Sequence, residues 1–437
     1  MIKQLRKEDA IKFLPHIFIV ILVLFSYLSF FPGLNANDSL EQWRQTISQG
    51  EISNYHPPIM VYLWKFTQIF FNGPQGLHFV HCLIYWAGIF LIANYFSNRI
   101  WVRLSVIILI GLFPPTYVWS LHLLKDSGMF VSFILAVALI LNYQKNQKVS
   151  YLYLATIFIF YGIAIRYNAI FAGFVLLYFN VKLICEHHQN SSFYKIYFSI
   201  IAAIIALIVC VNNIGTKHYN TLSTIQLWDL TAMSLDQNKV LLPRQVIKKS
   251  NLGDEEILKI LKREFSPYNC VPSFLSSNMI DLWQEESYTK HFLKTVLAHP
   301  KSYLKHRLRT TKHLFNSRNG FYYASIRGNE IDNHRAKISK YEFIPRQYEE
   351  VFIMKLAKKM IRNTFLFNPL FYIILSLLIV PFVKRNSAAF YLLLSSLAFE
   401  APLIFVAPAN DYRYNIWMIF VSLISLVLVA KDKFKIR

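Results

Sequence analysis

The chain has 437 residues, of which 55% are hydrophobic, and its formal net charge at pH 7 is +22. Soluble domains rarely exceed about half apolar residues, so the composition argues against a soluble globular protein. The charge does not indicate nucleic-acid binding, because much of the lysine and arginine lies at the ends of apolar runs, where membrane topology accounts for it. Apolar runs of roughly membrane-spanning length recur along the chain, and we therefore predict an all-α polytopic membrane protein.

The first apolar run, roughly Phe13–Phe31, follows several basic residues and lacks a small-residue cleavage site, which predicts a retained signal-anchor with a cytoplasmic N-terminus. The next run, Ile59–Phe71, is short and carries polar side chains at helical spacing, which favours a juxtamembrane helix in the first external loop. The other predicted spans are Leu77–Phe96, Leu104–Trp119, Ser127–Leu141, Tyr151–Ile165, Ala169–Val181, Ile196–Ile214, Phe365–Val383, Ala388–Val406 and Asn415–Ala430. This gives about ten transmembrane helices, basic inside loops and a cytoplasmic C-terminus.

A long polar stretch, 215–364, contains 25 Lys/Arg and 14 Asp/Glu residues. The parity of the spans places it outside, and long loops are largely exempt from the positive-inside tendency. We predict a large, mainly helical periplasmic domain, with helices near Glu255–Phe265, Ser287–Leu297 and Tyr303–Phe315. The predicted organisation is therefore an N-terminal transmembrane module (1–214) with catalytic first and second external loops, the large loop domain (215–364), and a C-terminal transmembrane module (365–437).

On this topology the short polar segments fall on one side of the membrane. Charged groups at a membrane face are costly, so they are candidates for function. Besides the large loop, the segments contain Asp38, Glu41 and His56, then His122, Lys125 and Asp126, then Arg166 and Asn168, and finally Asp411 and Arg413.

Each segment also has a purely structural interpretation. Asp38 with Glu41 fits a capping box, with Asp38 at the N-cap and Glu41 at the third helical position. His56 before two prolines suits a helix entry, and Lys125 with Asp126 could cap the next span. Arg413 lies between two tyrosines, as in an aromatic belt, yet a guanidinium there also suits a lipid phosphate. No metal or other cofactor is indicated, since the pair His187-His188 has no third ligand nearby.

These residues resemble motifs of the GT-C superfamily of polytopic glycosyltransferases, which use polyprenyl- or dolichyl-phosphate sugars. The resemblance rests on Asp38 after the first span, His56-Pro57-Pro58 opening a juxtamembrane helix, Asp126 in the next external loop, and Arg166 at the tip of a short hairpin. Within that group, the segments Leu124-Lys125-Asp126 and Asp411-Tyr412-Arg413-Tyr414 are similar to the phage-borne, serotype-converting O-antigen glucosyltransferases. The adjacent acids common after the first span in the family are absent, since Asp38 stands with Glu41 instead.

The resemblance implies transfer with inversion at the anomeric carbon. Asp38 is then the expected general base, with Asp126 and Glu41 as the other candidate catalytic carboxylates. A departing lipid phosphate needs positive charge beside it, for which the candidates are Arg166, Lys125 and Arg413. His56, His122 and Tyr414 are the candidate substrate-binding residues.

The expected protein is thus a bacterial inner-membrane glycosyltransferase with a periplasmic active site. It would move a sugar, glucose being the expected one, from a polyprenyl-phosphate donor to a surface polysaccharide such as lipopolysaccharide O-antigen, and the large loop would bind that acceptor. A polysaccharide polymerase or ligase predicts a dominant role for arginines in the large loop instead. A lipid-linked sugar flippase predicts charged residues at mid-membrane depth and a repeat of the two halves, and the sequence shows no such repeat.

Overall fold

The structure is a computed structural model that describes residues 2–33, 37–47, 51–268, 287–316 and 352–434. Within these ranges the chain is helical, apart from one parallel pair of two-residue strands, β1 (Ile52–Ser53) and β2 (Thr216–Lys217). The helices of the first half are α1 (Ile2–Ser29), α2 (Asn37–Thr46), α3 (Ile59–Thr67), α4 (Gln75–Phe96), α5 (Ile100–Val106), a π-helical turn (Ile107–Gly111), α6 (Pro114–Ser120), α7 (Lys125–Asn146), α8 (Ser150–Ala164), α9 (Ala169–His187) and α10 (Phe193–Asn213).

The remaining helices belong to the large loop and to the C-terminal part of the chain. They are α11 (Leu222–Gln237), α12 (Arg244–Ser250), α13 (Asp254–Glu264), α15 (Thr289–Ala298), α16 (Pro300–Asn316), α19 (Phe352–Asn363), α20 (Pro369–Ile379) with a 3₁₀ turn (Val380–Phe382), α21 (Ala388–Glu400), α22 (Leu403–Val406), a 3₁₀ turn (Tyr412–Asn415) and α23 (Ile416–Phe434).

Six of the described helical segments are long and apolar enough to cross a membrane, and a seventh span results if one bent pair counts as a single span. The bent pair joins Ile100–Gly111 to Pro114–Ser120 at 73°. Pro114 and Pro115 account for the break, because a proline interrupts the hydrogen bonds of the helix that precedes it. Three shorter apolar helices lie at other predicted spans, at Phe13–Ser29, Ser150–Ala164 and Pro369–Phe382. The fold is thus that of a polytopic helical membrane protein.

Helix α3 is the short segment that the sequence assigned to the membrane surface. It contains nine residues, which at about 1.5 Å per residue cannot cross a hydrocarbon core of about 30 Å. Met60 and Trp64 are fully buried against the protein, whereas Phe66 is 57% exposed. A short helix with one protein-facing side and one apolar exposed side suits a position along the membrane surface.

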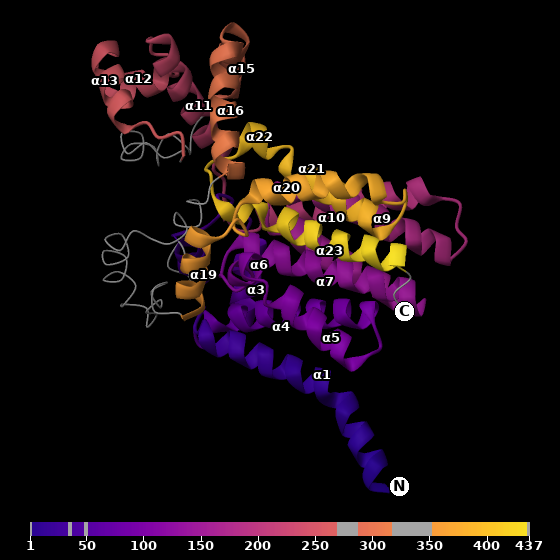
Figure 1. Ribbon diagram of the computed structural model, residues 1–437. Helices are drawn as coiled ribbons and strands as arrows, with labels where there is room; N and C mark the ends of the chain where they lie inside the picture. Colours follow the sequence, from indigo (N-terminus) through magenta and orange to yellow (C-terminus); the bar gives the residue numbers. More distant parts are fainter. Residues whose placement is uncertain (1, 34–36, 48–50, 269–286, 317–351, 435–437) are drawn as a thin grey trace.

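Helix α7 lies in the middle of the bundle (Figure 1). It packs mainly against α4 and α8. It is buried all round over the whole of its apolar stretch, as expected for a helix surrounded by others. Gly88 of α4 permits the close approach of that helix, because a Cβ atom there would lie 2.8 Å from Ile134 Cγ2 and 3.2 Å from the Leu135 backbone. The first turn of α7 therefore has a fixed place, and it carries Lys125 and Asp126.

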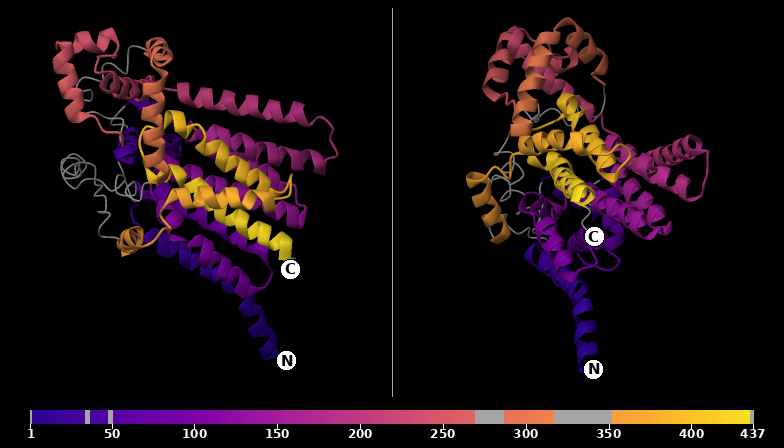
Figure 2. Two further views of the ribbon diagram at one scale, coloured as in Figure 1. Left: turned by 45° about the horizontal axis from the view of Figure 1, so that its top comes forward. Right: turned by 45° about the vertical axis from the view of Figure 1, so that its right-hand side comes forward.

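Helices α11, α12, α13, α15 and α16 form a separate unit at one end of the bundle, and both termini lie toward the other end (Figures 1 and 2). The unit has its own small core, which includes Leu227, Leu230, Ile257 and Leu261. The three helices predicted in the large loop correspond to α13, α15 and α16, while α11 and α12 were not predicted. Much of the predicted loop, including 317–351, lies outside the described residues.

Candidate functional site

Charged side chains from four separate parts of the chain meet at the end of the bundle near α11 and α16. Asp38 comes from the first turn of α2, Lys125 and Asp126 from the first turn of α7, Arg166 from the α8–α9 connection, and Arg413 from the turn before α23. The elements meet because each apolar helix begins or ends at this level, so the polar residues that terminate them share one layer. We call Asp38, Lys125, Asp126, Arg166, Asp411 and Arg413 the charge cluster.

Asp38 is the most accessible acid of the charge cluster. Its Oδ2 lies 3.7 Å from Lys125 Nζ and 3.2 Å from Arg413 Nη2, and 27% of its side chain is exposed. The carboxylate therefore faces two cations while part of it stays open to a ligand.

Arg413 connects the acids of the charge cluster. Its Nε lies 2.8 Å from Asp411 Oδ2 and 3.6 Å from Asp126 Oδ2, while its Nη2 faces Asp38. The Asp411 carboxylate also accepts a hydrogen bond from the Arg413 backbone N–H, which starts the 3₁₀ turn. Arg413 is thus held in place by its own turn and is only 12% exposed.

Arg166 pairs with Asp126, and both side chains are almost completely buried. Arg166 Nε donates a hydrogen bond to Asn168 Oδ1 at 2.6 Å. The guanidinium also lies over the Tyr414 ring at 4.8 Å and the Phe399 ring at 5.2 Å, which adds cation–π attraction. This pair fixes the α8–α9 connection to the start of α7.

His56 joins the cluster through Lys125, whose ammonium donates to His56 Nδ1 at 2.7 Å. The segment that carries His56 is fixed from two sides. The β1–β2 pair binds it to the start of the large loop, and Asn54 accepts hydrogen bonds from Tyr219 N and Tyr167 Oη. The segment before α3 is thereby attached to the start of the large loop and to the α8–α9 connection.

Burial and the neighbouring positive side chains together determine the charge states of Asp38 and His56. Burial alone would raise the pKa of Asp38, but Arg413 and Lys125 outweigh it and hold that pKa well below its usual range. Burial, assisted by the charge of Lys125, lowers the pKa of His56 to about 3. At neutral pH the site thus contains an ionised Asp38 beside a neutral imidazole.

The structure does not bring all predicted site residues into this cluster. Glu41 is 49% exposed and pairs with Arg44 on its own helix at 3.6 Å, so it lies away from the other acids. The capping box also differs from the prediction, because α2 begins at Asn37 and places Asp38 inside its first turn. That position turns the Asp38 carboxylate toward α7 and Arg413 as well as toward the positive end of the helix dipole.

His122 and Tyr414 are both buried beside the cluster. His122 Nδ1 hydrogen-bonds the Val118 carbonyl at 2.9 Å, and its ring stacks on Trp119. Burial lowers the pKa of His122 to about 3. Tyr414 is 6% exposed and lies under the guanidinium groups of both Arg166 and Arg413. These contacts give both residues a packing role beside the charge cluster.

Three residues near the site were given no specific role by the sequence, although Asp411 was among its charged candidates. Asp411 holds Arg413, as described above. Glu400 is 5% exposed with neither carboxylate oxygen hydrogen-bonded within the described residues, and it interacts electrostatically with Arg166. Gln42 lies one helical turn after Asp38, and its buried amide has no hydrogen-bond partner in the described part of the chain. Glu400 had a sequence signal, because it is the one acid in a long apolar run.

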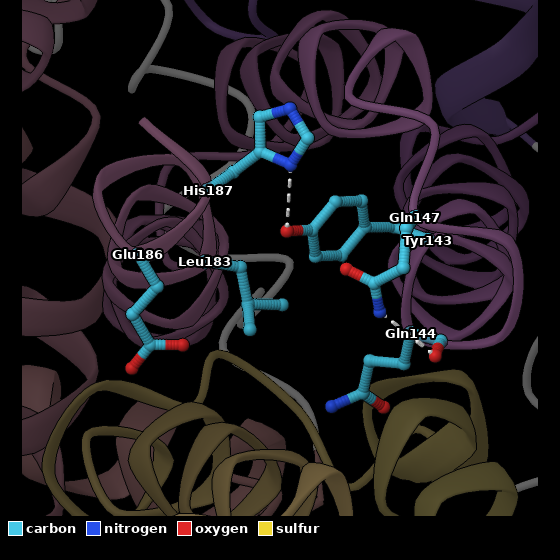
Figure 3. A pocket seen from close by; sticks show the side chains of 6 residues that line it. All are labelled: Tyr143, Gln144, Gln147, Leu183, Glu186 and His187. Atoms are coloured by element: carbon cyan, nitrogen blue, oxygen red, sulfur yellow. Dashed lines mark hydrogen bonds between the residues drawn. The ribbon is translucent and has the colours of Figure 1, made fainter. Parts of the chain in front are cut away.

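The cavity shown in Figure 3 lies at the other end of the bundle. It has a volume of about 530 Å³ and is lined by Tyr143, Gln144, Gln147, Leu183, Glu186 and His187. These residues end α7 and α9, whereas the charge cluster lies at the start of both helices. Since α7 has 22 residues, the two regions are separated by roughly 30 Å. The cavity therefore has no part in the charge cluster.

The donor set suits an anionic ligand better than a metal ion. Among the described residues, no group of three or more His, Cys, Asp and Glu side chains is placed to hold a metal ion. Lys125 and Arg413 instead present an ammonium and a guanidinium beside a partly open carboxylate. Such a pair can bind a phosphate oxygen while the carboxylate accepts a proton.

No family model, no curated protein and no solved structure matches this chain.

Proposed function

We propose that the protein is a membrane glycosyltransferase that moves a sugar, expected to be glucose, from a polyprenyl-phosphate donor to a surface polysaccharide such as lipopolysaccharide O-antigen. The observation that carries the proposal is the placement of Asp38 between Lys125 and Arg413 at one end of the helix bundle. The motif resemblance to GT-C glycosyltransferases supplies the substrate class.

The donor's phosphate is proposed to bind Lys125 and Arg413. In this structure both cations pair with Asp38. A bound phosphate diester would share Lys125 and Arg413 with that carboxylate. Binding would then weaken the stabilisation of ionised Asp38 and raise the pKa of its carboxyl group, since opposite charges nearby are what lower it. Donor binding would thereby make Asp38 a stronger base at the moment of reaction.

The transfer step forms a bond between the acceptor hydroxyl oxygen and C1 of the sugar. The bond between C1 and the phosphate oxygen breaks, and its electron pair leaves with the polyprenyl phosphate. Asp38 accepts the hydroxyl proton, and Lys125 and Arg413 stabilise the charge that develops on the leaving phosphate. Attack from the face opposite the phosphate inverts the anomeric configuration.

The contacts favour Asp38 over the two other acids as the base. The Asp126 side chain is completely buried and forms an ion pair with Arg166, whereas Glu41 pairs with Arg44 outside the cluster. Arg166 is assigned to holding the start of α7 and, through it, Lys125.

The proposed topology is the ten-span arrangement in the bacterial inner membrane, with both termini of the chain in the cytoplasm. The α11–α16 unit, near which the charge cluster lies, is at the end of the bundle away from the termini (Figure 2). With cytoplasmic termini, the cluster and the α11–α16 unit face the periplasm, where lipid-linked donor and polysaccharide acceptor meet.

The proposal is tested with membrane vesicles of both orientations that contain the protein. Each is supplied with polyprenyl-phosphate glucose labelled in the sugar and with a lipopolysaccharide acceptor. The proposal predicts covalent label in the polysaccharide when the periplasmic face is accessible. Label that only changes membrane face, without covalent transfer, would instead identify a flippase and overturn it.

A further inference from the structure

A second buried group of charged residues lies in the α11–α16 unit, outside the charge cluster. Arg307 of α16 donates from Nη2 to Asp229 Oδ2 of α11 at 2.5 Å, and both side chains are 1% exposed. His306 Nε2 lies 3.3 Å from the other oxygen of Asp229. A buried ion pair of this kind costs desolvation free energy, so it is a weak way to stabilise a domain. The other contacts of Arg307 therefore show what else this ion pair holds in place.

Arg307 also reaches out of its own unit. Its Nη1 donates to the Ala407 carbonyl at 3.0 Å, so one guanidinium bridges α11 and the segment after α22. Helix α16 packs along α22, which ends one residue before Ala407. A second link is close by, because the Asn410 backbone N–H donates to the Tyr268 carbonyl at 3.1 Å. The unit thus holds the segment from Ala407 to Asn410 at both of its ends.

That segment leads directly into the charge cluster. Asp411 follows Asn410, and its carboxylate accepts a hydrogen bond from the Arg413 backbone N–H and pairs with Arg413 Nε. Arg413 in turn contacts Asp38. A continuous path of hydrogen bonds and one short stretch of backbone therefore runs from Asp229 and Arg307 to the carboxylate proposed as the base.

We propose that Arg307 is a positioning residue that holds Arg413 in the charge cluster through the Ala407–Asn410 segment. In this way the α11–α16 unit, which is the candidate acceptor-binding domain, sets the geometry of the donor-phosphate site. This inference deepens the proposed function, and its kinetic test rests on that function. Arg307 touches neither substrate in this scheme.

Three variants test the proposal. Arg307→Met removes both donors but keeps the length of the side chain, and Arg307→Lys keeps the charge with a single ammonium. The matched control is Lys305→Met, which breaks the exposed 2.5 Å pair between Lys305 and Asp236 on the same two helices. Lys305 is 76% exposed, and its partner Asp236 lies on α11 rather than in the 407–410 segment. All three purified proteins are compared with the wild type by amide hydrogen exchange and by transfer kinetics.

The structural readout is independent of any activity. For Arg307→Met, we expect the amides of Asn410 and Arg413 to exchange at least about tenfold faster, because their segment loses an anchor. Arg307→Lys restores part of the protection, and Lys305→Met leaves it unchanged. Equal exchange at these two amides in the wild type and both Arg307 variants would overturn the inference, whatever the protein catalyses. If Arg307→Met does not fold, Arg307→Lys alone provides this comparison.

The kinetic readout separates positioning from general damage. We expect Arg307→Lys to raise the KM for the lipid-phosphate donor severalfold and to leave the KM for the acceptor unchanged, since the displaced group is Arg413. An unchanged donor KM in a variant with faster exchange would overturn the coupling to the donor site. If the wild type transfers no sugar while the amides of Asn410 and Arg413 still exchange faster in Arg307→Met, the proposed function fails and the positioning role remains.

Discussion

Arg413 and Asp38 lie near opposite ends of the chain, yet Arg413 Nη2 is 3.2 Å from Asp38 Oδ2. This contact joins α2 to the turn that begins the last helix. Lys125 approaches the same oxygen from the start of the central helix α7. A site assembled in this way from three distant segments depends on the whole helix bundle for its geometry.

Lys125 is proposed to bind the donor phosphate, so Lys125→Gln is expected to weaken donor binding. Loss of one charge-assisted contact should raise the donor KM about tenfold, which corresponds to about 1.4 kcal/mol. The control is Lys217→Gln, which removes a lysine paired with Glu51 outside the cluster. Steady-state transfer kinetics measure both variants. An unchanged donor KM in Lys125→Gln would remove Lys125 from the phosphate site.

The buried pair of Asp126 and Arg166 is expected to matter first for stability. Asp126→Asn leaves the Arg166 guanidinium buried without its counter-ion, and loss of one partner of such a pair costs about 3–5 kcal/mol. We expect a clearly lower Tm for the detergent-purified protein. The double variant Asp126→Leu with Arg166→Met should recover part of the loss, because no unpaired charge remains.

A surface pair on the same bundle provides the control for that measurement. Lys182 and Glu186 are 3.8 Å apart and partly exposed, so Glu186→Gln should change stability by less than about 1 kcal/mol. Equal Tm values for Asp126→Asn and Glu186→Gln would show that the Asp126–Arg166 pair does not hold the start of α7.

The low pKa of His56 predicts a stability that depends on pH. The folded protein holds His56 neutral down to about pH 3, whereas an exposed histidine takes up a proton below about pH 6.5. In that pH interval the unfolded state therefore binds more protons than the folded state. The contribution of neutral His56 to the free energy of unfolding is fully present above pH 6.5 and is lost progressively as the pH falls toward 3.

Tm measured across this pH range checks the prediction. Wild-type Tm should fall on acidification, and His56→Gln, which keeps a polar group near Lys125, should show a smaller fall. His122 has the same low pKa and will retain part of the dependence in that variant. Identical pH profiles of the two proteins would show that His56 does not contribute.

The sequence predicted which polar segments belong to one face of the membrane, and the structure brings Asp38, Lys125, Arg166 and Arg413 together at one end of the helix bundle. Such a prediction is possible because apolar runs fix where the chain leaves the membrane. Which of these side chains pair with one another depends on how the helices pack side by side. Hydropathy carries no information on that packing. The partnership of Arg166 with Asp126 and the outward position of Glu41 could not be read from spacing alone.

Other features needed three-dimensional contacts for different reasons. Helix α11 has no strong period of apolar residues, since it is enclosed by α13, α15 and α16 and buries polar residues such as Asp229. The link from Arg307 to Ala407 ends on a backbone carbonyl, which leaves no trace in the side-chain sequence. The exact start of α2, which decides the direction of the Asp38 side chain, is also beyond the accuracy of capping patterns.

The most direct test of the central claim is the rate of sugar transfer by Asp38→Asn beside Glu41→Gln, two amide replacements on the same helix. Asp38→Asn keeps the shape of the side chain but cannot accept the proton, so the account predicts that kcat falls by at least about 100-fold. Glu41→Gln, whose side chain lies outside the charge cluster, should stay within about twofold of the wild type, as is usual for exposed sites. Equal transfer by the wild type and a normally inserted Asp38→Asn would contradict the account, because Asp38 would then not be the base.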